Sequence, residues 1–250
     1  MRLNRYLAAC GLGSRRSCEE LIRSGRVRVN GEPAHFGMVV ADADRVTLDG
    51  RVVLPQGSDS VWMLHKPAGV VSTMRDPQGR PTLLDLVRRQ GIESRLFPVG
   101  RLDFETTGLL LLTNDGNLSL RLTHPAWGIE KEYEATVERP LSDEALDHLA
   151  GGVDLDDGRT APCRVAQEQR GSRTCVRLVL HEGRKRQVRR MLAAVGHPVG
   201  RLHRVRVGPL HLGDLPQGAM RALRKSERQA LVAALERAES EAGKRPEPSA

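Results

Sequence analysis

The stretch that decides the fold is GRLDFETTGLLLLTNDG, residues 100–116. Four consecutive leucines, Leu109–Leu112, run into a Thr-Asn-Asp-Gly turn, a pattern that predicts a short strand buried on both faces. Asp103 and Glu105 lie in the loop just before that strand. An acidic side chain at the mouth of a buried strand costs desolvation energy unless it is paired. The loop is therefore a candidate functional site, and a solvated loop is the alternative.

The composition points to a polyanionic partner. The chain has 250 residues, 39% of them hydrophobic, and a formal net charge of +8. An excess of this size favours nucleic acid as the partner, although a generally arginine-rich composition would also produce it. Aromatic residues make up only 3% of the chain, which argues against a stacking platform for single strands.

Several classes of function receive no support from the sequence. Cys10, Cys18, Cys163 and Cys175 form no CxxC pair, so we expect no structural zinc. No motif for a nucleotide cofactor or a catalytic metal is present, and we expect no cofactor. We also expect no signal segment and no membrane partner. These features predict a soluble, cytoplasmic, monomeric protein with reduced thiols.

The first ~50 residues predict a small separate module. Leu3, Leu7 and Cys10 recur at helical spacing, and Ser14 can cap a second helix. Asn30-Gly31 is a hairpin turn signal. Seven arginines precede Asn30, against two glutamates. This clustering, which includes Arg15 and Arg16, favours a phosphate-contacting patch over a solvated helix face.

The rest of the chain predicts an α+β fold with a mixed, largely antiparallel sheet and flanking helices. Strands are expected at 61–64, 132–138 and 176–180, and helices at 83–87 and 117–123, after Ser142 and near the C-terminus. We expect a small basic domain over 1–54, a linker over 55–60, a larger domain over 61–237 and a disordered tail over 238–250.

A basic helix is expected after residue 187. Val188, Met191, Leu192 and Val195 form an apolar stripe. Arg189 falls at the edge of this stripe, where it could turn inward and would need a carboxylate partner. Between residues 183 and 213 there are eight arginines or lysines and no acidic residue. A solvated face normally mixes signs, so this run favours phosphate binding.

Two resemblances cover nearly the whole chain. RLNRYLAACGLGSRRSCEELIRSGRVRVNGEPA, residues 2–34, resembles an S4 domain, a small RNA-binding module. GRLDFETTGLLLLTNDG resembles the motif of the RsuA/RluB/RluE/RluF family of ribosomal RNA pseudouridine synthases. HKPAGVVSTMRDPQGRPTLLDLV, KEYEATV, EGRKRQVRRM and VGRLHRVRVGPL match the same family in the same order. The segment RDPQGRPT is most similar to the RluB branch, which acts on large-subunit rRNA.

The resemblance implies that a uridine in RNA is converted to pseudouridine. It implies that Asp103 is the nucleophile, with attack on the sugar and attack on the base both open. It implies that Arg189 pairs with Asp103 and keeps it charged, and that Tyr133 stacks on the extruded base. At Tyr133 an ordinary strand tyrosine is the alternative.

Further residues match motif positions with less defined roles. Arg101 and Thr107 are expected to shape the aspartate loop, Leu202 to form a pocket wall, and Lys66 to support the active-site floor or a phosphate. Glu105 occupies a variable motif position, so we interpret it as solvated or structural. The expected RNA contacts are Arg15, Arg16, Arg184, Arg186, Arg190 and Arg204.

Two other functions fit parts of the sequence. A non-catalytic RNA-binding or ribosome-assembly factor would explain the S4 module and the charge. A glycosidase or nucleosidase acting on small molecules would use Asp103 and Glu105, but it would leave both basic regions without a purpose.

Overall fold

The computed structural model describes residues 1–55, 60–92 and 94–242. The chain divides into two compact units, one formed by Met1–Ser60 with Asn114–Gly116 and the other by Val61–Thr113 with Asn117–Ala250. Most of the expected linker, residues 56–59, lies outside the described residues.

The first unit packs two helices on a small sheet. Its helices are α1 (Leu3–Ala9) and α2 (Arg15–Arg23), and its strands are β1 (Val27–Val29), β2 (Glu32–Pro33), β3 (Val46–Leu48) and β4 (Arg51–Val52), ordered β2-β1-β3-β4. Ser14 caps α2 by accepting a hydrogen bond from the Ser17 N–H. The predicted helices and hairpin are thus confirmed. Arg15 and Arg16 are exposed at the start of α2.

The second unit is built on a nine-stranded sheet, whose main path is ordered β11-β12-β8-β13-β7-β5-β15. Its strands are β5 (Val61–Lys66), β6 (Phe97–Val99), β7 (Thr107–Thr113), β8 (Lys131–Val137), β11 (Arg164–Arg170), β12 (Arg173–Leu180), β13 (Arg201–Val207), β14 (Leu210–His211) and β15 (Met220–Ala222). Strands β7 and β13 run parallel, and the other pairings described in this sheet are antiparallel. This confirms the predicted α+β class.

Helices cover both faces of this sheet. They are α3 (Leu83–Arg89), α4 (Gly116–Thr123), α5 (Asp143–Gly151), α6 (Gln187–Ala194) and α7 (Lys225–Ala242), with a short 3₁₀ turn η1 (Pro125–Trp127). A separate two-stranded hairpin consists of β9 (Asp154–Leu155) and β10 (Gly158–Arg159). In the described part of the chain, no helix is long and apolar enough to span a membrane.

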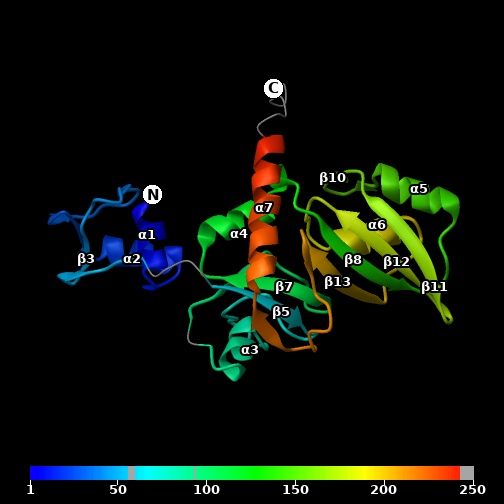
Figure 1. Cartoon of the computed structure of the whole chain (residues 1–250), viewed down its shortest axis with the longest axis horizontal. Coiled ribbons are helices and arrows are strands. Elements are labelled where there is room, and N and C mark those ends of the chain that lie inside the picture. Colours follow the sequence, from blue (N-terminus) through cyan, green and yellow to red (C-terminus); the bar gives the residue numbers. More distant parts are fainter. Residues whose placement is uncertain (56–59, 93, 243–250) are drawn as a thin grey trace. The chain divides into compact units, whose positions relative to one another are not determined.

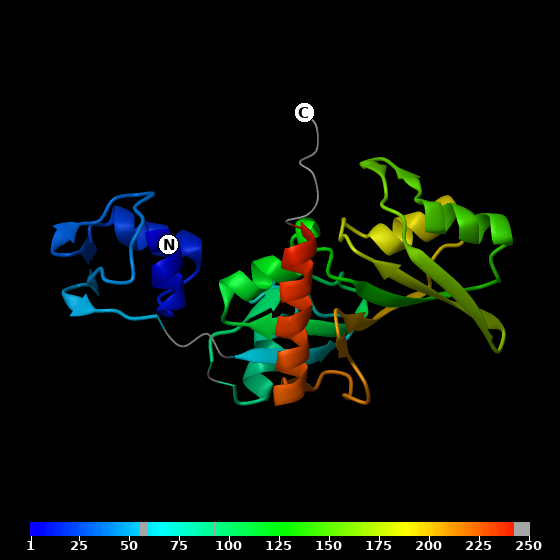
Figure 2. The same cartoon turned by 45° about the horizontal axis from the view of Figure 1, so that its top comes forward.

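Strand β7 lies in the middle of the hydrophobic core. Leu109 and Leu111 pack in one cluster with residues of α7, and Leu110 and Leu112 pack in another with residues of α3. Figures 1 and 2 show α7 lying across β7 and β5. Because side chains alternate along a strand, four leucines in a row can serve both layers. The predicted two-sided burial of this strand is confirmed.

The other half of the sheet, formed by β8, β12 and β13, carries α5 and α6 (Figure 1). Val188, Met191 and Leu192 of α6 are buried against it, as the apolar stripe predicts. Gly196, with φ +82°, follows the end of this helix.

The expected start of the disordered tail at residue 238 is wrong. Helix α7 continues to Ala242. Ala238 packs against the core cluster, and Glu239 forms an ion pair with Arg121 at 3.0 Å. These contacts give the last turn of the helix partners that its polar sequence does not reveal. Residues 243–250 lie outside the described part of the chain.

Candidate active site

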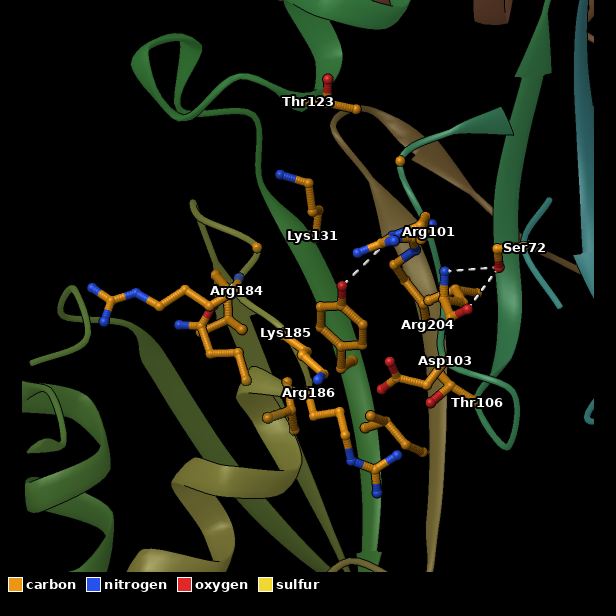
Figure 3. A pocket seen from close by; sticks show the side chains of 18 of the residues that line it. Ser72, Arg101, Asp103, Thr106, Thr123, Lys131, Arg184, Lys185, Arg186 and Arg204 are labelled. Atoms are coloured by element: carbon orange, nitrogen blue, oxygen red, sulfur yellow. Dashed lines mark hydrogen bonds between the residues drawn. The ribbon is translucent and has the colours of Figure 1, made fainter. Parts of the chain in front are cut away.

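A cavity of about 460 Å³ lies beside the loop that precedes β7. The loop contributes Arg101 and Asp103, β8 contributes Lys131 and Tyr133, and β13 contributes Leu202 and Arg204. The segment before α6 adds Arg184, Lys185 and Arg186. In Figure 3, Asp103 approaches from the loop, and the basic segment approaches from the other side.

Asp103 is the carboxylate of this cavity that is left free for chemistry. The other carboxylate in its lining, Glu182, accepts hydrogen bonds from the Ala161 N–H and from Gln187 Nε2, and it pairs with Arg184. Among the described residues, no hydrogen bond or ion pair engages the Asp103 side chain. Glu182 is therefore part of the scaffold, whereas Asp103 can react.

A buried lysine holds the backbone of the Asp103 loop. Lys66, at the end of β5, is 0% exposed, and its ammonium donates to four carbonyl oxygens. These belong to Pro67 (2.9 Å), Asp103 (3.1 Å), Phe104 (3.4 Å) and Thr106 (2.9 Å). Burial lowers the pKa of Lys66 to about 8, and the nearby Asp103 charge opposes this shift. Lys66 thus fixes the turn and places a positive charge near Asp103.

A second clamp acts on the residue before Asp103. The Ser72 hydroxyl donates to the Leu102 carbonyl at 2.6 Å and accepts from the Leu102 N–H at 3.1 Å. The Gly69 N–H also donates to the Phe104 carbonyl at 2.9 Å. The loop is therefore tied down on both sides of Asp103, as a site that depends on precise orientation requires.

Gly108 brings the loop close to β13. It pairs with Arg204 in the parallel ladder and has φ +113°. A Cβ atom at this position would overlap the Arg204 backbone. Glycine is therefore needed here for close backbone approach as well as for the positive φ.

Tyr133 and Arg204 form the wall next to Asp103. Arg204 is only 4% exposed, and its Nε donates to the Leu109 carbonyl at 2.8 Å. Its Nη1 donates to the Tyr133 hydroxyl at 3.4 Å. Leu202, 5% exposed, adds an apolar surface. A flat ring, an apolar wall and fixed cations suit a planar polar ligand attached to a phosphate.

Comparison with known proteins decides the family. The family model described as RNA pseudouridylate synthase matches residues 60–194, and the S4 domain model matches residues 1–35. This chain belongs to the RNA pseudouridylate synthase family.

Relatives of this synthase span nearly its full length. An uncharacterized RNA pseudouridine synthase of Aquifex aeolicus is 41% identical over 91% of this chain and 92% of its own. The ribosomal large subunit pseudouridine synthase B of Bacillus subtilis is 39% identical over 90% of this chain and 93% of its own. A crystal structure of a pseudouridylate synthase, 33% identical, superimposes with a TM-score of 0.65 over 92% of this chain and 99% of its own.

The expected ion pair between Asp103 and Arg189 is not among the ion pairs of the described residues. Arg189 Nη1 donates to the Val199 carbonyl at 2.9 Å, and Nη2 lies 3.9 Å from Glu105. The edge of the α6 stripe does turn inward, since the Arg189 side chain is 11% exposed. The carboxylate within ion-pair distance of Arg189, however, is that of Glu105.

Two expected RNA contacts are bound within the synthase itself. Arg184 donates to the carbonyls of Gly158 (2.8 Å) and Arg159 (2.6 Å), and Arg190 pairs with Asp157 at 2.9 Å. Their partners lie in the β9–β10 hairpin, about 30 positions earlier in the sequence. The acid-free run over residues 183–213 therefore does not leave these two arginines unpaired, because Glu182 and the β9–β10 hairpin supply their acceptors.

Thr107 also lies elsewhere than expected. Side chains alternate along a strand, and Thr107 and its neighbour His203 face away from the Asp103 cavity. The Thr107 hydroxyl lies 2.8 Å from His203 Nδ1. Sequence reasoning missed Ser72, which lies within HKPAGVVSTMRDPQGRPTLLDLV, and Lys131, which is the first residue of KEYEATV. No group of three or more metal-binding side chains occurs in the described ranges.

Replacing Ser72 tests how far turnover depends on the loop clamp. We expect Ser72→Ala to lower the free energy of unfolding by about 1–2 kcal/mol, because two hydrogen bonds are lost. Turnover should fall about tenfold as Asp103 loses orientation. Ser142→Ala is the matched control: it removes the α5 cap, costs about 1 kcal/mol and should leave turnover unchanged. Equal turnover of the two variants would contradict the clamp.

Two lysines make stability depend on pH. Burial lowers the pKa of Lys131 to about 8, with a further decrease from Arg204, and the pKa of Lys66 is also lowered to about 8. Both values lie below the ordinary 10.5. Between about pH 8 and pH 10.5 the unfolded chain binds more protons at these lysines than the folded chain does. The two lysines therefore make the free energy of unfolding rise with pH in this range. Urea midpoints from about pH 7.5 to about pH 9.5 should rise less in Lys131→Met than in wild type. Equal slopes would refute the assignment to Lys131.

Proposed function

We propose that this synthase converts a specific uridine of ribosomal RNA, in the large subunit, to pseudouridine, with Asp103 as the nucleophile. The observation that carries the proposal is the free Asp103 carboxylate, held by its backbone at a cavity walled by Tyr133, Leu202 and Arg204. The large-subunit assignment is supported by the similarity to the Bacillus subtilis enzyme and by the segment RDPQGRPT. The same proposal places the synthase in the cytoplasm.

The reaction is balanced within the nucleotide. The N1–C1′ bond breaks, the uracil turns while it is bound, and a C5–C1′ bond forms. C5 then loses its hydrogen and N1 gains one, so mass and redox state are unchanged. An ionised carboxylate can bond to C1′ or to the base and leave again. The Lys66 ammonium, which donates to the Asp103 carbonyl, adds a positive charge beside this carboxylate.

RNA must present the uridine outside its helix stack. Tyr133 offers a ring face that offsets part of the unstacking cost. Arg15 and Arg16 of the S4 domain, both exposed, would contact phosphates of the same RNA. Arg101 and Lys185 are exposed at the cavity and would add charge there.

The decisive experiment is the mapping of pseudouridines in ribosomal RNA from a deletion strain by carbodiimide adducts. We expect one large-subunit position to lose its adduct and a plasmid copy of the gene to restore it. Retention of every pseudouridine would refute the proposed function. Loss of a small-subunit position would refute the large-subunit assignment.

A further inference from the structure

Arg186 has a backbone conformation that its residue type does not favour. Apart from glycines, three of the described residues have positive φ: Asn30 (+56°), Asp49 (+50°) and Arg186 (+52°). Asn30 and Asp49 each precede a glycine in a turn, where Asn and Asp are readily tolerated. Arginine gains no such local hydrogen bond, and glycine would fit at lower cost. The presence of an arginine at this position, where glycine would cost less, indicates that the side chain is used.

The contacts of Arg186 within the protein do not explain this cost. Its Nη2 lies 3.9 Å from Glu105, and the side chains are 45% and 64% exposed. An exposed pair at this distance contributes little to stability. The side chain does line the Asp103 cavity (Figure 3). The use of Arg186 therefore lies in what the cavity binds.

Glu105 is shared between two guanidinium groups. Arg189 Nη2 also lies 3.9 Å from the same carboxylate oxygen. Arg189 is largely buried, and within the described structure its Nε is buried with no hydrogen-bond partner. A buried donor without a partner is costly. The exposed Glu105 carboxylate thus contacts both arginines only loosely. A second anion that approached them more closely would bind them more strongly than Glu105 does.

We propose that Arg186 and Arg189 form a clamp for an RNA backbone phosphate beside the target uridine, and that Glu105 occupies this clamp until RNA displaces it. Guanidinium groups bind phosphate oxygens through paired, charge-assisted hydrogen bonds. A nucleotide that enters the cavity leaves its phosphates at the mouth, where Arg186 lies. Glu105 is two residues from Asp103, so its displacement occurs on the catalytic loop. This inference rests on the proposed function.

The clamp is tested by RNA binding in an Asp103→Asn background, which separates binding from turnover. The probe is an in vitro transcript of large-subunit rRNA, measured by filter binding over a series of salt concentrations. Arg186→Gly should weaken binding about tenfold and reduce the slope of log affinity against log salt by about 1. Its melting temperature should not fall, and relief of strain should raise it by up to about 4 °C. Arg186→Asn, which also tolerates positive φ, should show the same loss of slope.

A matched control separates the effect of the clamp on RNA affinity from the effect of losing one positive charge anywhere on the protein surface. Arg139→Gln removes an exposed arginine that does not line the cavity, and we expect less than a twofold change in affinity. Equal effects of Arg139→Gln and Arg186→Gly would overturn the clamp. An Arg186→Gly variant with a wild-type salt slope would also overturn it.

Glu105→Gln tests the displacement. Removing the carboxylate should strengthen binding up to about fivefold, the scale of one exposed ion pair. Glu144→Gln, at an exposed position on α5, removes the same charge and should have a smaller effect. In Arg186→Gly the gain from Glu105→Gln should shrink, because the two residues are coupled. Equal gains at residues 105 and 144 would refute the displacement. The carbodiimide map tests the proposed function separately.

Discussion

Asp103→Asn is expected to reduce pseudouridine formation at least about a thousandfold, because an amide cannot act as the nucleophile. The change is isosteric and should not disturb the loop. Lys66 binds the Asp103 carbonyl, Ser72 binds Leu102, and no hydrogen bond among the described residues depends on the Asp103 side chain. The variant should therefore fold as the wild type does, and its affinity for RNA should stay within about twofold of the wild-type value.

The reaction supplies its own readout for this prediction. C5 loses its hydrogen when it bonds to C1′, so a transcript tritiated at uracil C5 releases tritium once per turnover. Filter binding of the same transcript reports affinity. Glu144→Gln is the control for loss of a negative charge, and we expect wild-type release from it. Wild-type tritium release from Asp103→Asn would remove Asp103 from the mechanism, and loss of binding would indicate a role in RNA recognition instead.

Lys66→Met should produce the largest combined loss of stability and activity. Methionine fills much of the lysine volume but donates no hydrogen bond. The four carbonyls around the ammonium would lose a shared donor in a buried site. We expect the free energy of unfolding to fall by on the order of 3 kcal/mol. Turnover should fall at least about a hundredfold, because a displacement of the loop misplaces Asp103.

Lys131→Met is the matched control for the stability part of this prediction. Lys131 is a half-buried lysine that also has a lowered pKa, but its ammonium donates to one carbonyl, that of Ile129, at 3.1 Å. Its replacement should not lower stability at neutral pH, because it removes one hydrogen bond but also a charge whose burial is unfavourable. Urea denaturation at neutral pH compares the two variants, and circular dichroism verifies that each is folded before turnover is measured. A loss of stability in Lys131→Met as large as that in Lys66→Met would show that the carbonyl cage does not determine the effect.

Local sequence patterns were sufficient to predict a helix or strand wherever its apolar residues recur at regular spacing. Strand β7, helix α6 and the Ser14-capped α2 follow directly from their residues. Strand β11 was not predicted, because Arg164–Arg170 is polar and partly exposed and pairs only with β12. The two-residue strands β9 and β10 are too short to give a periodic signal. These elements form because a neighbouring strand completes their hydrogen bonds.

The sequence by itself determined the α+β class, the family motifs and the position of Asp103 before a buried strand. These depend on residue order and on short-range periodicity. Only the tertiary structure decided which charges meet. In the folded chain Lys66 donates to the backbone of the Asp103 loop, and Arg189 lies near Glu105. Arg184 and Arg190 bind the β9–β10 hairpin. Ion pairs and carbonyl cages join residues distant in the chain, and their geometry depends on how helices and loops are rotated against the sheet. A linear pattern of charges carries no information about that rotation.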